Sequence, residues 1–210
     1  MIQELLQHPD FLIVNKPAGV SCHNDPDSVI QKYGKEWHLA NRLEKENSGL
    51  LVITKNSKLQ NSIQNALSEG EKIYSAVMRG SMPLSDSWNE WNTPISDQGE
   101  GRDNPQGKSV DWKDSKTLYK VVKSNQYFSL LECQLITGRQ HQIRKHSLLA
   151  GRPIVGDSRY GNLKDNQRIS QKYGFDRLAL HAWKIRFNWN EVSVSCESPI
   201  PASFQDLFST

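Results

Sequence analysis

The stretch that decides the fold of this chain reads Thr137-Gly-Arg-Gln-His-Gln-Ile-Arg-Lys-His146 and continues as Gly151-Arg-Pro-Ile-Val-Gly-Asp-Ser-Arg-Tyr-Gly161. Thr137 and Gly138 predict a turn that leads into a helix. Gly151 and Pro153 predict the end of this helix, which should therefore cover residues 141–150. Residues 133–156 contain no acid, and their cations are Arg139, Arg144, Lys145 and Arg152. Donors crowded at a helix N-terminus favour binding of an anion, although a solvated helix face would carry the same pattern.

Around this stretch, strand patterns dominate and helix patterns are few. A helix is predicted between Asn56 or Ser57, either of which can cap it, and Gly70, which ends it. Strands are predicted over residues 11–15, 50–54, 73–79, 117–123, 127–136, 183–189 and 192–196. Hairpins with a few helices and no regular βαβ alternation indicate an α+β fold with a largely antiparallel, mixed sheet. Only residues 85–115 resemble a linker, so we expect a single domain over residues 1–210.

The composition indicates a soluble globular protein without a membrane span. The chain has 210 residues and a net charge of +3, and its mean hydropathy is −0.66. Its apolar runs are too short to span a bilayer, and no secretory signal is visible. Cys22, Cys133 and Cys196 lie far apart, which favours a reduced, cytoplasmic location over a disulfide framework or a zinc site. His141 and His146 are also a poor metal pair, since a spacing of five places them about 140° apart on a helix.

Two earlier segments carry further chemistry. Residues 41–50 read Asn41-Arg-Leu-Glu-Lys-Glu-Asn-Ser-Gly-Leu50, and residues 72–80 read Lys72-Ile-Tyr-Ser-Ala-Val-Met-Arg-Gly80. In an extended chain Arg42 and Glu44 share one face, which taken alone is typical of a surface ion pair. Tyr74, taken alone, is typical of cross-strand packing.

Together, the three segments resemble the RluA-type family of RNA pseudouridine synthases. The family's first motif, H-R-L-D-x-x-T-S-G-L, corresponds to residues 41–50, and its second, K-x-Y-x-A-x-V-x-G, to residues 72–80 with the valine offset by one. Its third motif, T-G-R-x-H-Q-I-R-x-H followed by G-x-P-I-x-G-D-x-x-Y-G, is matched almost completely over residues 137–161. Similar stretches at 11–20 and 180–182 extend the resemblance to nearly the whole chain.

The resemblance implies a single pseudouridine synthase-like catalytic domain that isomerises uridine to pseudouridine in structured RNA, ribosomal or transfer. The target base is flipped out, its glycosidic bond is cleaved, and the base is rejoined to C1′ through C5. Glu44 supplies the carboxylate, Arg144 pairs with it and keeps it ionised, and Tyr74 stacks on the base. The implied RNA contacts are Arg42, Arg139, His141, Gln142, Lys145 and Arg152.

The resemblance also implies that the reaction needs no cofactor and no metal and that RNA is the partner. For the oligomeric state, a monomer is the default expectation. The opening strand begins at Phe11, so we expect no separate N-terminal RNA-binding domain.

Glu44 departs from the family pattern, because the family has an aspartate there. The extra methylene moves the carboxylate by roughly 1.5 Å if the backbone is fixed. Asn41 replaces the usual His and Asn47 the usual Thr. Three interpretations stay open: an active synthase that uses Glu44, a catalytically impaired relative that binds RNA, and an enzyme of another class such as a nucleoside glycosidase.

Overall fold

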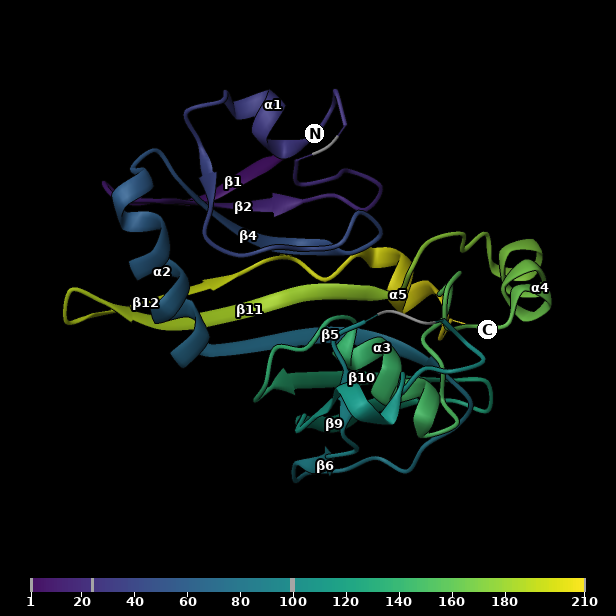
Figure 1. The fold of residues 1–210 in the computed structure, drawn as a ribbon. Coiled ribbons are helices and arrows are strands. Elements are labelled where there is room, and N and C mark those ends of the chain that lie inside the picture. Colours follow the sequence, from purple (N-terminus) through teal and green to yellow (C-terminus); the bar gives the residue numbers. More distant parts are fainter. Residues whose placement is uncertain (1, 24, 99–100, 210) are drawn as a thin grey trace. The chain divides into compact units, whose positions relative to one another are not determined.

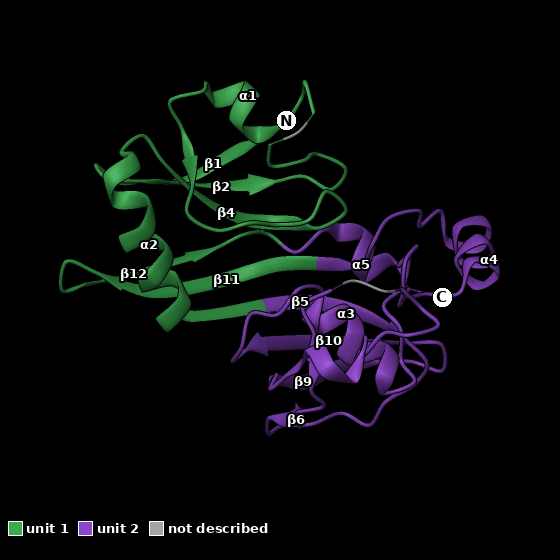
Figure 2. Ribbon diagram, viewed as in Figure 1, with its two compact units in different colours: residues 1–73, 181–199 green, residues 74–180, 200–210 purple. Residues whose placement is uncertain are grey.

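The computed structural model describes residues 2–23, 25–98 and 101–209, and its contacts divide the chain into two compact units (Figure 2). Unit 1 consists of residues 1–73 and 181–199, and unit 2 of residues 74–180 and 200–210. The chain passes between them within strand β5 (Glu71–Arg79), at the start of strand β11 (Leu180–Trp189) and after Pro199, so neither unit is one continuous segment. That residues 1–210 act as a single catalytic domain stays a prediction.

Unit 1 is built around strand β4 (Ser48–Thr54), every residue of which is buried. Strand β2 pairs with β4 and with β1, both antiparallel, and β3 pairs antiparallel with the C-terminal end of β4. Strand β11 pairs with β4 in parallel, and β12 pairs with β11 antiparallel. The bounds are β1 (Gln3–Gln7), β2 (Leu12–Lys16), β3 (His38–Leu39) and β12 (Val192–Glu197). The mixed but largely antiparallel pairing confirms the predicted fold class.

The helices of unit 1 are α1 (Val29–Tyr33) and α2 (Ser57–Glu69), and α2 packs against β3 and β4 (Figure 1). The Asn56 side chain accepts a hydrogen bond from the backbone amide of Lys58, which satisfies a free donor at the start of α2. Ile63 and Leu67 are the buried residues of α2. The predicted helix and its N-cap are therefore confirmed.

In unit 2, strand β10 lies between β5 and β9, and β6 follows on the far side of β9. The pairs β9–β10 and β6–β9 are antiparallel, and β7 and β8 form a separate two-stranded sheet. A tight turn joins β9 to β10, in which Asn125 Oδ1 accepts hydrogen bonds from the amides of Tyr127 and Phe128. The bounds are β6 (Asn89–Trp91), β7 (Ile95–Ser96), β8 (Trp112–Lys113), β9 (Thr117–Ser124) and β10 (Phe128–Leu135).

The helices of unit 2 are α3 (Gln142–Leu149), α4 (Leu163–Tyr173) and α5 (Ala202–Asp206), with a short 3-10 turn over Ser109–Asp111 (Figure 1). Their core includes Val77, Leu131, Ile143, Ile169 and Phe204. Residues 142–147 of α3 are all buried, so this helix presents no broad solvated face. The predicted helix at 141–150 is confirmed, whereas the sequence pattern did not predict α4. Among the described residues, no helix is long and apolar enough to cross a membrane.

Candidate active site

Glu44 lies in unit 1 on the loop between β3 and β4, and its side chain is half-buried. The backbone of this loop is held in several places. The Leu43 carbonyl accepts from the Cys22 thiol at 3.2 Å, and the Lys45 carbonyl accepts from the Gly19 amide at 2.8 Å. The Glu44 carbonyl accepts from the Asn47 amide at 3.1 Å, which closes a tight turn. Glu44 therefore projects from a fixed backbone.

Lys16 holds the same turn from inside unit 1. Its side chain is fully buried, and its ammonium donates to the carbonyls of Lys45 at 3.3 Å and Asn47 at 2.5 Å. It also donates to the carbonyls of Pro17 at 3.0 Å and Val20 at 2.7 Å. One cation thus joins the loop after β2 to the loop that carries Glu44. Lys16 lies in the stretch 11–20 that extends the family resemblance, but the sequence did not indicate this structural role.

The start of β4 is fixed against β11. The Ser48 hydroxyl and His181 Nδ1 are 2.7 Å apart, and both residues are buried. Gly49 has a φ of +112°, and a Cβ there would collide with the Ala182 carbonyl oxygen. Only glycine fits this position, so the Ser-Gly of the first motif has a structural cause.

The two asparagines that replace family residues lie on either side of Glu44. Asn41 Oδ1 accepts from the Val52 amide at 2.7 Å, and Asn41 Nδ2 donates to the Leu50 carbonyl at 3.4 Å, so this side chain bonds to the backbone of β4. Asn47 is buried, and its Oδ1 has no hydrogen-bond partner among the described residues. This acceptor is therefore unsatisfied among the described residues, beside the Glu44 turn.

In unit 2, Arg144 is held by a buried carboxylate. Its Nε and Nη2 donate to the two carboxylate oxygens of Asp157, each at 2.8 Å. Asp157 Oδ1 also accepts from the amides of Arg159 and Tyr160, and the Tyr160 ring centroid is 5.2 Å from the Arg144 guanidinium. A bidentate pair of this kind fixes the plane of the guanidinium as well as its charge.

His141 caps the start of α3 in the left-handed conformation, with a φ of 57°. Its Nδ1 lies 2.8 Å from the Tyr160 hydroxyl. Burial, followed by the positive charge of Arg144, lowers the pKa of His141 to about 4. Its imidazole is therefore neutral at neutral pH, and any contact with RNA would be a hydrogen bond and not an ion pair.

Two predicted RNA-binding residues, Gln142 and Lys145, must be reassigned. The Gln142 amide accepts from Thr137 Oγ1 and the Arg139 amide and donates to the Lys116 carbonyl and Thr117 Oγ1. The fully buried Lys145 ammonium donates to the carbonyls of Ser96 at 2.6 Å and Gln98 at 2.7 Å. Both side chains hold segments of unit 2 together, because α3 is buried on the face where the sequence suggested solvent.

His146 has a comparable structural role in unit 2. Its Nδ1 lies 2.9 Å from Thr117 Oγ1, and its Nε2 lies 3.0 Å from the Thr93 carbonyl and 3.2 Å from Ser115 Oγ. Burial lowers the pKa of this imidazole. It therefore connects α3 to both ends of the polar segment at residues 93–115.

The remaining predicted site residues are more accessible. Arg42 is exposed in unit 1, and Tyr74 is half-buried against the core of unit 2. Arg139 is half-buried, and its Nε donates to the Asp114 carbonyl at 3.1 Å. The half-buried Arg152 lies against Gly80, where a Cβ would collide with Arg152 Nη1. Arg42, Arg139 and Arg152 can therefore reach a ligand outside the core.

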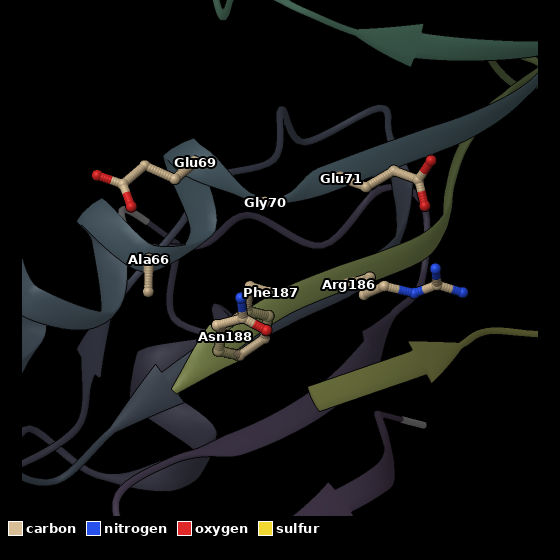
Figure 3. Close-up of a pocket in the computed structure, with 7 residues that line it drawn as sticks. All are labelled: Ala66, Glu69, Gly70, Glu71, Arg186, Phe187 and Asn188. Atoms are coloured by element: carbon tan, nitrogen blue, oxygen red, sulfur yellow. The ribbon is translucent and has the colours of Figure 1, made fainter. Parts of the chain in front are cut away.

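A pocket of about 350 Å³ lies in unit 1 where α2 ends (Figure 3). Glu69 and Glu71 point away from each other on either side of Gly70, so their carboxylates do not converge on one substrate atom. None of the predicted site residues lines it; the lining is Ala66, Glu69, Gly70, Glu71, Arg186, Phe187 and Asn188. Among the described residues, no group of three or more His, Cys, Asp or Glu side chains is placed to hold a metal ion.

Comparison with known proteins gives the context for this geometry. The chain is 32% identical to an uncharacterized RNA pseudouridine synthase of Bacillus subtilis, YlyB, over 94% of this chain and 69% of that protein. It is 33% identical to ribosomal large subunit pseudouridine synthase D of Neisseria meningitidis, over 94% of this chain and 58% of the relative. It is also 32% identical to ribosomal large subunit pseudouridine synthase C of Buchnera aphidicola, over 84% of this chain and 59% of that protein. The chain thus spans less than two thirds of the two ribosomal synthases.

Solved structures share the fold. The human RNA pseudouridylate synthase domain containing 1 aligns with a TM-score of 0.79 at 22% identity, covering 100% of this chain and 96% of that one. The human RNA pseudouridylate synthase domain containing 4 aligns with a TM-score of 0.77 at 22% identity, covering 98% of this chain and 93% of that one. The sequence profile of the RNA pseudouridylate synthase family matches residues 10–148. This match and the similarity to the bacterial relatives confirm the predicted resemblance: the chain belongs to the RNA pseudouridylate synthase family, in its RluA-type branch.

Proposed function

We propose that this protein isomerises uridine to pseudouridine in RNA. Family membership supports the reaction class, and the bidentate Arg144–Asp157 pair carries the proposal, because it presents a fixed, buried cation of the kind that could orient a catalytic carboxylate. The N1–C1′ bond of the target nucleotide breaks, a C5–C1′ bond forms, C5 loses its proton and N1 gains one. Atoms and charge balance, so the reaction consumes no co-substrate.

Glu44 supplies the carboxylate in this mechanism. It acts at the sugar carbon or as the base while the uracil is detached. The hydrogen bonds from Lys16, Cys22 and Gly19 hold the backbone of its turn, from which the longer side chain extends. The buried acceptor of Asn47 lies in the same turn and distinguishes this segment from the family pattern.

Arg144 orients and stabilises the Glu44 carboxylate. Its Nε and Nη2 donate to the two carboxylate oxygens of Asp157, so Asp157 fixes the orientation of the guanidinium. A cation beside a carboxylate favours its ionised form. Asp157 acts through Arg144 and is a positioning residue.

Tyr74 stacks on the detached uracil. An aromatic ring that is half-buried against a packed core is a rigid platform for a base and loses little entropy on binding. Stacking would keep the base in place while it turns from N1 to C5.

The substrate proposed is a structured RNA whose target uridine leaves its stack, and the ribosomal names of two relatives favour ribosomal RNA. Arg42, Arg139 and Arg152 contact phosphates, because their guanidinium groups are the more accessible ones of the predicted set. His141 contributes a neutral polar contact.

One observation favours a second function, RNA binding without turnover. Glu44 stands where the family has aspartate, and a misplacement of about 1 Å can reduce a catalysed rate on the order of a hundredfold.

The experiment that separates the two measures pseudouridine in ribosomal RNA lacking the modification, incubated with wild type, Glu44→Asp and Glu44→Gln. We expect product from wild type, none from Glu44→Gln, and a rate roughly a hundredfold lower from Glu44→Asp. Product from Glu44→Asp with none from wild type would contradict an active Glu44 and support the binding function.

A further inference from the structure

The outward face of helix α4 in unit 2 is cationic. Lys164, Arg168 and Lys172 are exposed and spaced four residues apart, so they follow one side of the helix about 6 Å from one another along its axis. The residues exposed between them are the neutral Gln167 and Gln171. We call Lys164, Arg168 and Lys172 the α4 ridge.

The acid of α4 lies off this face. Asp165 forms an ion pair with Arg79 and a second one, at 3.7 Å, with Arg168, and its side chain is half-buried. Like charges four residues apart repel one another, and a helix face adapted only to water usually alternates cations with acids. The ridge therefore keeps a net positive charge even with the ion pair between Arg168 and Asp165.

The ridge is rigidly attached to the segment that positions Arg144. Asn166, on the inner side of α4, donates to the Asp157 carbonyl at 2.9 Å and accepts from the Gly156 amide at 3.2 Å. Asn162 caps the helix by accepting from the amides of Lys164 and Asp165. The cations thus stand on an element fixed to the turn that holds the proposed catalytic arginine.

An exposed aromatic ring lies at one end of the ridge. Lys172 Nζ is 5.0 Å from the centroid of Tyr127, which is 48% exposed. The Tyr127 carbonyl accepts from the Gly80 amide at 2.7 Å, and Arg152 lies against Gly80. Cations next to an exposed aromatic ring are the combination that binds a nucleic-acid strand, through phosphates and base stacking.

We propose that the α4 ridge binds the phosphodiester backbone of the RNA beside the target uridine, with Tyr127 stacking on an unpaired base. The inference rests on RNA being the substrate of the proposed function. Because phosphate contacts position a nucleic acid without reading its sequence, the ridge contributes affinity and leaves the choice of uridine to other contacts.

The test compares two variants that lose the same charge. One is Lys164→Gln/Arg168→Gln/Lys172→Gln, and the control is Lys32→Gln/Lys35→Gln/Lys58→Gln, three exposed lysines of unit 1. Binding of a fluorescently labelled stem-loop RNA with uridines in its loop is followed by anisotropy over a range of KCl concentrations. Circular dichroism and melting curves establish that both variants are folded.

We expect the ridge variant to bind at least about tenfold more weakly, with a salt slope smaller by roughly 2 to 3, because each lost phosphate contact removes about 0.7 to 0.9. The control should keep the wild-type slope. Equal losses in both variants would overturn the inference in favour of a net-charge effect, and no loss in the ridge variant would identify the ridge as a solvated face.

Turnover separates this inference from the proposed function. If wild type forms pseudouridine, the ridge variant should raise KM by the same factor as Kd and leave kcat unchanged. If wild type forms none, the proposed activity fails, whereas the anisotropy comparison still decides whether the ridge binds RNA.

Discussion

At the scale of single residues, the Arg144–Asp157 pair should be the most sensitive point of unit 2. Both side chains are buried, so Asp157→Asn leaves the buried guanidinium of Arg144 without a negatively charged partner. Removing one partner of such a pair typically costs about 3–5 kcal/mol, and we expect a decrease of that size in the free energy of unfolding. Urea unfolding followed by tryptophan fluorescence measures it.

The matched control is Glu90→Gln, which breaks the exposed ion pair with Lys116 in the same unit. It should leave the urea midpoint unchanged, because exposed pairs contribute little. Similar losses in both variants would show that the burial of the Arg144 pair is not what stabilises unit 2.

Lys16 should affect catalysis more than its distance along the sequence from Glu44 suggests. Lys16→Met removes the donor to four backbone carbonyls, two of them in the Glu44 turn. If the proposed reaction operates, we expect kcat to fall at least about tenfold with KM unchanged, since small displacements of a catalytic group are costly.

Thr54→Val provides the control for Lys16→Met. Thr54 is buried at the opposite end of β4, and its hydroxyl donates to the Asp10 carbonyl and accepts from the Asn56 amide. This variant should lose stability and retain kcat below its melting temperature. If kcat falls in proportion to the loss of stability in both variants, Lys16 acts only through packing.

These residues also mark the limit of what the sequence could predict. The third motif identified the polar side chains of α3, yet not that Gln142 and Lys145 point into the protein. The sequence of a cationic stretch does not show whether its side chains are exposed to solvent or donate to buried backbone carbonyls. The structural role of Lys16 could not be predicted for a related reason. Its acceptors are backbone carbonyls, which every residue has, so the sequence does not distinguish them.

At the scale of elements, the junction between β4 and β11 depends on Gly49. Gly49→Ala meets two obstacles: a φ of +112° and a collision between the new Cβ and the Ala182 carbonyl oxygen. Backbone on a neighbouring strand cannot rotate away, so we expect a loss of about 2–4 kcal/mol in unfolding free energy. Thermal and urea unfolding of the purified variant provide the measurement.

Gly151→Ala separates the two causes. Gly151 has a φ of +71°, and a Cβ added there would meet nothing within 4 Å, so this variant tests backbone conformation without a clash. Its cost should be about 1 kcal/mol. If Gly49→Ala costs no more than Gly151→Ala, the close approach of β11 is not the reason for glycine in this motif.

Strong patterns predicted elements correctly, and weak patterns did not. The apolar run of β4 and the capped, apolar face of α2 follow from the sequence because burial there is one-sided or complete. Helix α4 has Ile169 as its buried residue, and its other apolar side chains are the exposed Leu163 and the half-buried Tyr173, so its apolar stripe is too narrow to reveal it. Strands β6, β7 and β8 are too short for any periodicity to be read.

At the scale of the whole molecule, the α+β class could be predicted but the partition into two units could not. The boundary falls inside β5 and at the start of β11, whereas the strands predicted there cover residues 73–79 and 183–189 and carry no signal of a division. Local alternation fixes which residues are buried, whereas the pairing partner of a strand depends on contacts distant in sequence. The long-range parallel pairing of β11 with β4 is of this kind.

Acid should destabilise the folded protein through the histidines of unit 2. Burial, then the charge of Arg144, lowers the pKa of His141 to about 4 from an ordinary value of 6.5, and burial also lowers the pKa of His146. Between pH 6.5 and about 4 the unfolded chain therefore binds protons that the folded state excludes. The free energy of unfolding should fall as pH decreases through this window and be independent of these groups above it.

The variant His141→Asn isolates one of the two groups. Its unfolding should take up about one proton fewer than that of wild type in this window, so its stability should depend less steeply on pH. Urea unfolding across the window gives both slopes, and carboxyl groups that titrate at the acidic end are common to the two proteins. Identical slopes would mean that His141 is protonated in the folded state, with its bond to Tyr160 rearranged, and that the Arg144 cluster tolerates a further positive charge.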